Sequence, residues 1–277
     1  MREKYIIKKV LSNNVILVTH KDKEYILVGK GVGFGKKKDS VLEDVENVEN
    51  TFISLEGLDK YEYEQLLSKV DKKIAAATEE IIAMISKKWG EELNPNIHIG
   101  LIDHINFAIK RLQENIDIIN PFLTETKIMY PKEYELAQEA VEILKEKLNI
   151  QIPDAEIGFI AFHIHGALKS KDKAVALKIT KLVNNLIKTV EDELHIAIKR
   201  DSFDYVRFVI HIRGIISRLE NDKVFENPLL DKIKEQFEFE FGLALKLGKI
   251  IENELKIKVP EDELAYMAMH IHKLKEI

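Results

Sequence analysis

The stretch PDAEIGFIAFHIH, residues 153–165, recurs 107 residues later as PEDELAYMAMHIH, residues 260–272. Extended in both directions, the same offset aligns residues 101–170 with residues 208–277 without a gap, and 21 of these 70 positions are identical. Chance gives only a handful of identities over such a length, so the chain carries two copies of one domain. A period of 107 residues is too long for a solenoid repeat and indicates tandem globular domains.

The repeated region has a helical pattern. Ile105, Ala108, Ile109 and Leu112 follow the spacing of a buried helix face, which ends before Asn120-Pro121. A proline followed by acidic residues at 153–156 is typical of a helix start, and that helix carries His163. The remaining predicted helices cover residues 74–89, 134–148 and 174–195.

The N-terminal region has a different pattern. Runs rich in strand-forming residues at 5–10, 15–19, 24–28 and 51–55 are separated by turn formers, and residues 29–35 contain four glycines. They predict an antiparallel β module that is too small to bury much core by itself, and dimerisation would compensate for this. The expected fold class is therefore mainly α, with this β module followed by two homologous helical bundles. We place the domains at 1–57, 65–170 and 171–277.

Charge is distributed unevenly. Residues 1–38 hold ten Lys or Arg and three acids, whereas residues 39–64 hold nine acids and one Lys. A basic head suggests a polyanionic partner, although two ordinary solvated surfaces explain the counts equally well. The chain has no cysteine, which excludes disulfides and thiolate chemistry. We see no signal peptide and no apolar run of membrane-spanning length, so we expect a cytoplasmic protein without membrane insertion.

Four of the nine histidines are paired by the repeat. His104 and His163 recur as His211 and His270, each pair 59 residues apart. Structural retention is one explanation, and metal binding or acid–base catalysis are others. His163 and His165 point about 200° apart on a helix, so they cannot easily chelate one ion. No other residues suggest a catalytic pocket.

A further option is that these histidines accept phosphoryl groups. A neutral imidazole is nucleophilic near pH 7, and a phosphorylated one carries roughly two negative charges. Those charges can move domains or shift a dimer equilibrium. Arg111 and Arg218 lie two turns beyond the first histidine of each copy, where they serve as phosphoryl partners or as ordinary salt bridges.

Several segments resemble motifs of one known family. KVLSNNVI (9–16) and GKGVGF (29–34) look like paired RNA-binding segments, and DHINFA (103–108) looks like a first-histidine motif. GFIAFH (158–163) and YMAMH (266–270) look like second-histidine motifs. In this order the chain resembles the BglG/SacY family of transcriptional antiterminators over its whole length. Its members have a co-antiterminator RNA-binding domain followed by two PTS regulation domains (PRDs).

The resemblance implies that the N-terminal domain binds, as a homodimer, a leader-mRNA hairpin of a sugar-utilisation operon and so prevents termination. The RNA-binding residues it implies are Lys9, Asn14, Gly29, Lys30, Gly31 and Phe34. Lysines neutralise phosphates, an Asn amide reads base edges, glycines allow close approach, and Phe34 stacks on a base. The alternatives are that Asn14 is a turn residue, that the glycines only shape a loop, and that Phe34 belongs to a core or dimer interface.

The resemblance also implies that His104, His163, His211 and His270 are phosphorylated by HPr and a sugar-specific enzyme II of the phosphotransferase system. Enzyme II typically acts on the first PRD and inactivates, whereas HPr typically acts on the second and activates. In this interpretation His165 and His272 are neighbours, and the protein is not an enzyme and needs neither metal nor cofactor. The rivals are a helical metal-dependent enzyme that uses the repeated histidines and a DNA-binding PRD activator.

Overall fold

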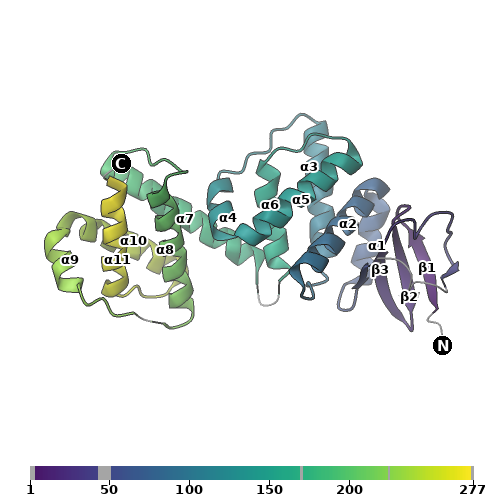
Figure 1. The fold of residues 1–277 in the computed structure, drawn as a ribbon, viewed down its shortest axis with the longest axis horizontal. Coiled ribbons are helices and arrows are strands. Elements are labelled where there is room, and N and C mark those ends of the chain that lie inside the picture. Colours follow the sequence, from purple (N-terminus) through teal and green to yellow (C-terminus); the bar gives the residue numbers. More distant parts are fainter. Residues whose placement is uncertain (1–3, 43–50, 169–170, 224, 276–277) are drawn as a thin grey trace. The chain divides into compact units, whose positions relative to one another are not determined.

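The structure is a computed structural model that describes residues 4–42, 51–168, 171–223 and 225–275. Its packing gives two compact units, shown in Figure 1. The first unit comprises Met1–Pro121 and Lys132–Ala176. The second comprises Phe122–Pro131 and Leu177–Ile277. The predicted class, a small β module followed by helical bundles, is confirmed.

The first unit begins with an antiparallel sheet in the strand order β4-β1-β2-β3-β5. Its strands are β1 (Tyr5–Val10), β2 (Val15–His20), β3 (Lys23–Val28), β4 (Val41–Leu42) and β5 (Thr51–Ser54). Ile7, Ile16, Val18 and Leu27 form a buried apolar cluster. Strands β1, β2, β3 and β5 match the predicted runs to within a residue or two. The two-residue strand β4 was not predicted.

The helices of the first unit pack against the sheet and against each other. They are α1 (Lys60–Lys69), α2 (Lys72–Trp89), α3 (Ile97–Gln113), α5 (Pro131–Leu148) and α6 (Ala155–Gly166). Helix α2 contacts β2, β3 and β5, and α3 contacts α1, α2 and α6. The fully buried Glu79 of α2 joins three helices, because it accepts hydrogen bonds from Tyr63 Oη of α1 at 2.6 Å and His98 Nδ1 of α3 at 2.7 Å.

The second unit is helical in its described residues. It contains α4 (Leu123–Met129), most of α7 (Lys173–Leu194), α8 (Phe203–Glu220), α9 (Leu230–Gln236), α10 (Glu238–Leu255) and α11 (Glu261–Lys275). Helix α11 packs on α8, α9 and α10, and α4 packs on α8. At the 107-residue offset α4 and α9 have identical bounds, as do α5 and α10. The structure therefore contains the duplication that the sequence predicts.

The short helix α4 shows where the duplication and the packing diverge. It belongs to the first copy by sequence, yet it packs within the second unit, where Tyr205 Oη donates to Glu125. None of the helices in the described ranges is both long and apolar enough to span a bilayer.

Candidate functional site

The first two repeated histidines lie face to face. His104 comes from α3 and His163 from α6, and these helices pack against each other. Their ring centroids are 4.7 Å apart and the ring planes are inclined by 33°. Residues 59 positions apart in the sequence therefore form one site.

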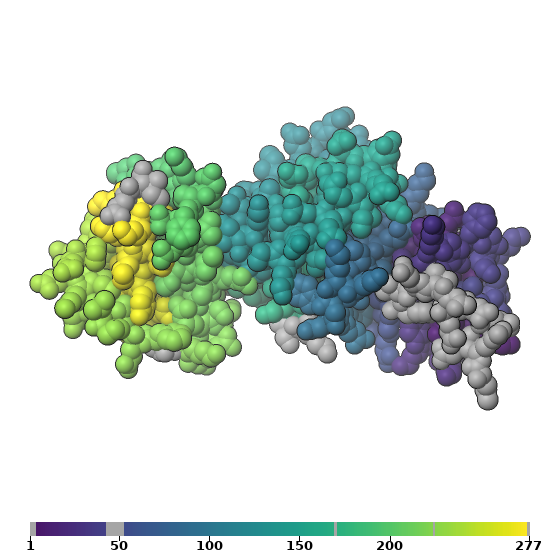
Figure 2. Space-filling view, viewed as in Figure 1, coloured from purple at the N-terminus to yellow at the C-terminus, as the bar shows by residue number. Residues whose placement is uncertain are grey.

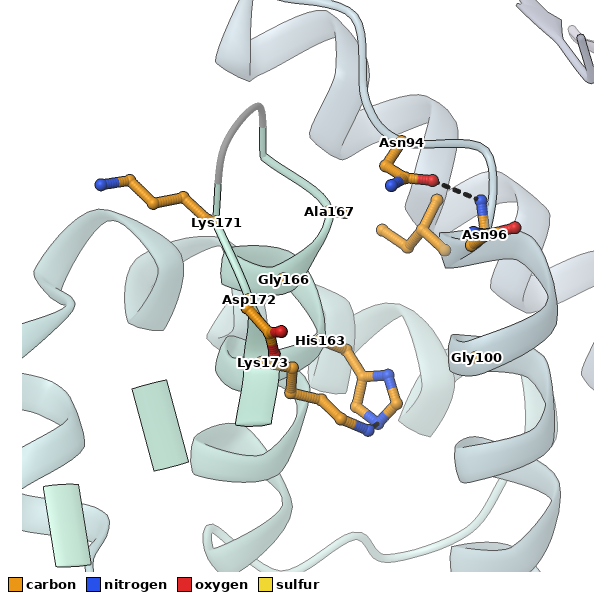
Figure 3. A pocket seen from close by; sticks show the side chains of 10 residues that line it. Asn94, Asn96, Gly100, His163, Gly166, Ala167, Lys171, Asp172 and Lys173 are labelled. Atoms are coloured by element: carbon orange, nitrogen blue, oxygen red, sulfur yellow. Dashed lines mark hydrogen bonds between the residues drawn. The ribbon is translucent and has the colours of Figure 1, made fainter. Parts of the chain in front are cut away.

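Each ring of this pair has one further polar partner. Glu156, in the first turn of α6, places its Oε2 2.8 Å from His104 Nε2. Lys173, in the first turn of α7, places its Nζ 3.2 Å from His163 Nε2. Figure 3 shows the side chains of His163 and Lys173 meeting beside Gly100. The space around them is a pocket of about 350 Å³.

The environment keeps the His163 ring neutral. Burial, with smaller contributions from the neighbouring His104 and Lys173, lowers the pKa of His163 to about 2. A neutral imidazole retains the lone pair that a nucleophile needs, so His163 has nucleophilic form throughout the physiological pH range.

The second pair repeats this geometry on α8 and α11. His211 and His270 have ring centroids 4.4 Å apart and planes inclined by 33°. Burial, with smaller contributions from His270 and Arg218, lowers the pKa of His211 to about 3. Burial also lowers the pKa of His270, assisted by Arg207. Figure 2 shows part of α11, in yellow, on the surface of the second unit.

The acidic partners of the two pairs differ. Glu156 contacts His104, but its repeat counterpart Glu263 accepts two hydrogen bonds from Arg218, at 2.6 Å from Nε and 2.7 Å from a terminal nitrogen. His211 Nε2 is consequently buried with no hydrogen-bond partner among the described residues. Of the two predicted alternatives for Arg218, the structure shows the salt bridge.

The other repeated histidines have structural partners. His165 Nδ1 lies 2.8 Å from Glu133, and His272 Nδ1 lies 3.2 Å from Glu240, the same pair one repeat later. His163 and His165 therefore face different neighbours, as their helical spacing predicts. Within the described residues, no group of three or more His, Asp or Glu side chains could hold a metal ion.

The sequence singles out the four histidines but does not predict Glu156 and Lys173 as side chains that contact them. Glu156 was visible as a repeated identity, and its role follows only from the contact between α3 and α6. Lys173 lies just beyond the aligned copy, so the repeat gave no signal for it.

A second candidate surface lies on the sheet, around the glycine-rich loop. Asn14 Oδ1 accepts a hydrogen bond from the Gly31 amide at 3.0 Å, and the Gly29 amide donates to the Asn14 carbonyl at 2.9 Å. Gly31 has a φ of +74°, a conformation that favours glycine. Asn14 thus links the β1–β2 turn to the glycine-rich loop, as expected of a turn residue, and its side chain lies next to that loop.

The side chains of the predicted RNA-binding residues differ in exposure. Phe34 is 73% exposed, so it is not part of the core of this chain. Lys30 is exposed as well. Lys9 is half-buried, its Nζ donates to the Leu67 carbonyl at 3.2 Å, and burial lowers its pKa. The structure therefore places Lys30 and Phe34 outward and turns Lys9 toward α1.

The loop also depends on a glycine that the sequence reasoning did not single out. A Cβ on Gly33 would lie 2.2 Å from the Ser12 carbonyl oxygen, which is far closer than atoms can approach. The Gly33 amide donates to the Asn13 carbonyl at 2.9 Å. This contact holds the glycine loop against the β1–β2 turn, and with it the position of Phe34.

Known proteins have the same order of domains. Residues 5–57 match the family described as CAT RNA binding domain, and residues 79–167 and 184–274 each match the family described as PRD domain. The chain is 38% identical over 277 residues to the PtsGHI operon antiterminator of Bacillus subtilis (strain 168), covering 99% of this chain and 98% of that protein. It is 36% identical to Protein GlcT of Staphylococcus saprophyticus, with 98% of each covered.

A solved structure gives the same result. The crystal structure of GlcT CAT-PRDI shares 43% identity and a TM-score of 0.51 with this chain, and covers 60% of this chain and 99% of its own. A β-sheet RNA-binding domain followed by two PRDs defines a class of regulatory protein. The chain belongs to the BglG/SacY family of transcriptional antiterminators, which are RNA-binding regulators and not enzymes.

Proposed function

We propose that this chain acts in the cytoplasm as a homodimer that stabilises a leader-mRNA hairpin of a sugar-utilisation operon. The hairpin overlaps a terminator, so transcription continues while the protein holds it. Residues 1–57 bind the RNA, and residues 65–170 and 171–277 are the two regulatory domains. Phosphorylation of His104, His163, His211 and His270 by HPr and a sugar-specific enzyme II sets the activity.

The observation that carries the regulatory part is the repeated stacked histidine pair. Rings 4.7 Å and 4.4 Å apart, with His163 and His211 held neutral by burial, are suited to accept a phosphoryl group. Phosphorylation of one histidine adds roughly two negative charges next to the other histidine of the pair. Before phosphorylation, that other ring packs against a neutral imidazole. That change favours a different packing of α3 on α6 or of α8 on α11, which gives the regulation a physical basis.

The RNA part is supported by the exposed aromatic and basic side chains around the glycine loop. Phe34 is available to stack on an unpaired base, and Lys30 to pair with phosphate. Gly29 and Gly31 let the backbone approach the RNA, and the Asn14 amide lies beside them. The name of the Bacillus relative makes the leader of a ptsGHI-type operon the first RNA to test.

Phosphoryl transfer from purified enzyme I, HPr and enzyme II to the full chain tests the regulatory part. We expect acid-labile phosphate on the protein, reduced stepwise by His104→Ala, His163→Ala, His211→Ala and His270→Ala. In a read-through reporter, His104→Asp or His163→Asp should lower antitermination. No labile phosphate on the wild type, or unchanged read-through in both Asp variants, would contradict the regulatory assignment.

Gel-shift titration of the full chain against candidate leader hairpins tests the RNA part. Phe34→Ala and Asn14→Ala should weaken binding, whereas Phe203→Ala, an aromatic of the second unit that is also 73% exposed, should not. If no hairpin binds, or if Phe34→Ala and Phe203→Ala bind alike, the RNA-binding assignment of this loop fails.

A further inference from the structure

Lys173 stands out because it reaches the first histidine pair from outside the repeated segment. It lies in the first turn of α7, whereas the histidines lie on α3 and α6. The two chain segments are in close contact here: a Cβ on Gly166, the last residue of α6, would lie 2.7 Å from Lys173 Cβ and 3.0 Å from its backbone nitrogen. Glycine at 166 therefore permits Lys173 to approach His163.

The contact between Lys173 and His163 determines which ring nitrogen carries the lone pair. An ammonium group only donates hydrogen bonds, so at 3.2 Å from Lys173 Nζ the Nε2 of His163 must accept. The proton of the neutral ring then resides on Nδ1, on the side where a Cβ at Gly100 would lie 3.5 Å away. Nε2 is therefore the nitrogen with the lone pair, which points toward Lys173 Nζ. His163 and Lys173, whose side chains meet in Figure 3, both line the pocket.

From this geometry we propose that Nε2 of His163 is the atom that accepts the phosphoryl group, and that Lys173 is a positioning residue that then binds the phosphoryl oxygens. The inference rests on the proposed function, because it assumes that His163 is phosphorylated. It adds the acceptor atom and a residue outside the four histidines. Lys173 orients the lone pair before transfer and pairs with the dianion afterwards.

The pocket has the size and polarity that this role requires. Its volume of about 350 Å³ is several times the ~30 Å³ that one water molecule occupies in the liquid, so a phosphoryl group fits. Asn94 and Asn96 line it as neutral polar groups. The carboxylate of Asp172 also lines it, but accepts hydrogen bonds from the Ala174 amide at 2.6 Å and the Val175 amide at 3.4 Å at the start of α7. Those amides offset its negative charge.

The transfer step balances without a further reactant. The donor is a phosphohistidine of a carrier protein, protonated on its other ring nitrogen. The His163 Nε2 lone pair attacks the phosphorus, the new N–P bond forms as the donor N–P bond breaks, and the donor leaves as a neutral imidazole. His163 keeps its Nδ1 proton and becomes positively charged, next to a phosphoryl dianion that Lys173 can contact.

The second histidine pair has its nearby cation on a different element. At the 107-residue offset Gly100 corresponds to Arg207, and Arg207 is close enough to His270 to lower its pKa. A cation from α8 thus stands near the second pair, whereas the first pair has a cation from α7. The cation near each pair therefore comes from a different element, although the histidines are duplicated.

The test uses the full chain with His211→Ala and His270→Ala, so that label enters only the first pair. Lys173→Met removes the ammonium, and Lys173→Arg keeps the charge. Lys181→Met controls for net charge, because Lys181 is an exposed lysine of α7 that does not line the pocket. The measurements are the initial rate of phosphoryl incorporation at His163, the linkage of the phosphohistidine by 31P NMR, and the tautomer of unphosphorylated His163 by 15N NMR.

We expect an Nε2 linkage and an Nδ1–H tautomer in the parent protein, and a rate that Lys173→Met lowers roughly tenfold, as the loss of one charge-assisted hydrogen bond implies. Lys173→Arg should restore most of the rate, and Lys181→Met should not change it. An Nδ1 linkage, or equal rates in the parent and Lys173→Met, would overturn the inference while leaving the proposed function intact. Absence of any phosphate on parent His163 would instead overturn the proposal that His163 is an acceptor.

Discussion

At the scale of single residues, the same glutamate has different partners in the two copies. Glu156 contacts a histidine, and Glu263 holds Arg218 by two hydrogen bonds. A glutamine can still accept one hydrogen bond from His104. It cannot accept both from Arg218, because one of its two polar atoms is a donor.

This difference predicts unequal effects of one substitution. Glu263→Gln should cost about 1–3 kcal/mol of unfolding free energy, because a partly buried guanidinium loses its carboxylate, whereas Glu156→Gln should cost less than about 1 kcal/mol. Denaturant unfolding measures the total loss of unfolding free energy. Hydrogen exchange of the α11 and α6 amides shows which unit is destabilised. Equal losses in the two variants would mean that the bidentate pair contributes no more than the Glu156–His104 contact.

The buried histidines predict a specific dependence of stability on pH. Their folded pKa values, about 2 for His163 and about 3 for His211, lie below the ordinary value near 6.5. Between those values the unfolded chain binds the proton and the folded chain does not. Each histidine therefore contributes stability that is complete above about pH 6.5 and is lost as the pH falls.

The expected loss between pH 7 and pH 5 is roughly 2 kcal/mol for each such histidine. His163→Gln and His211→Gln should each reduce the loss of unfolding free energy between pH 7 and pH 5 by about this amount. Urea titration at several pH values measures the loss. His195→Gln, an exposed position, is the control. Parallel pH curves for the wild type and both buried-site variants would show that these rings already carry protons in the folded state.

The sequence predicts candidate site residues where the repeat itself marks them. The four histidines follow from duplication, and the Glu133 and Glu156 repeats were equally visible. The stacking of His104 on His163 does not follow, because it depends on how α3 crosses α6. The contact between Lys173 and His163 is even harder to predict from the sequence. It requires that the start of α7 packs against α6 and that a glycine, Gly166, lies at the point of contact.

At the scale of elements, helix α10 contains two glycines with opposite surroundings. A Cβ on the exposed Gly242 would meet nothing within 4 Å, whereas a Cβ on the buried Gly248 would lie 2.7 Å from Leu264 Cδ2 of α11. The first glycine only weakens the helix, and the second allows α10 and α11 to pack closely.

Alanine substitutions should separate these two roles. Gly242→Ala should stabilise the second unit by about 0.5–1 kcal/mol through helix propensity. Gly248→Ala should destabilise it by about 1–3 kcal/mol, because the added methyl forces Leu264 to move within a packed core. Thermal unfolding of the two variants beside the wild type measures both. Stabilisation by both substitutions would indicate that α10 and α11 separate easily.

Elements with a strong local pattern were predicted, and those without one were missed. Strands β1 to β3 are runs of strand-forming residues bounded by turns, and α2, α3, α5 and α7 have long apolar faces. Helix α1 is rich in charged residues and buries only Tyr63 and Leu67. Its sequence therefore resembles a charged connector and gave no helix prediction. Strand β4 is two residues long, and α4 depends on its packing against α8, which no local pattern reveals.

At the scale of the whole molecule, charge separates the RNA-binding end from the rest. The chain has a net charge of −5, yet residues 1–38 carry +7 (ten bases less three acids), so the remainder carries −12. RNA is a polyanion, so its binding should be confined to the basic end. Binding should weaken with added salt, because the release of counterions from the RNA then becomes less favourable.

Salt titration of hairpin binding by the full chain should therefore distinguish phosphate contacts from stacking. Lys30→Gln should make the dependence of log affinity on log salt shallower by about one, because one phosphate contact is lost. Phe34→Ala should weaken binding about tenfold or more at every salt concentration and leave the slope unchanged, because a stacked base contributes about 1–3 kcal/mol without releasing ions. Lys181→Gln, an exposed lysine of α7, is the charge-matched control and should alter neither. A slope that changes equally for Lys30→Gln and Lys181→Gln would place the electrostatic contribution in the net charge of the chain, and a slope that changes with Phe34→Ala would contradict the stacking role of that ring.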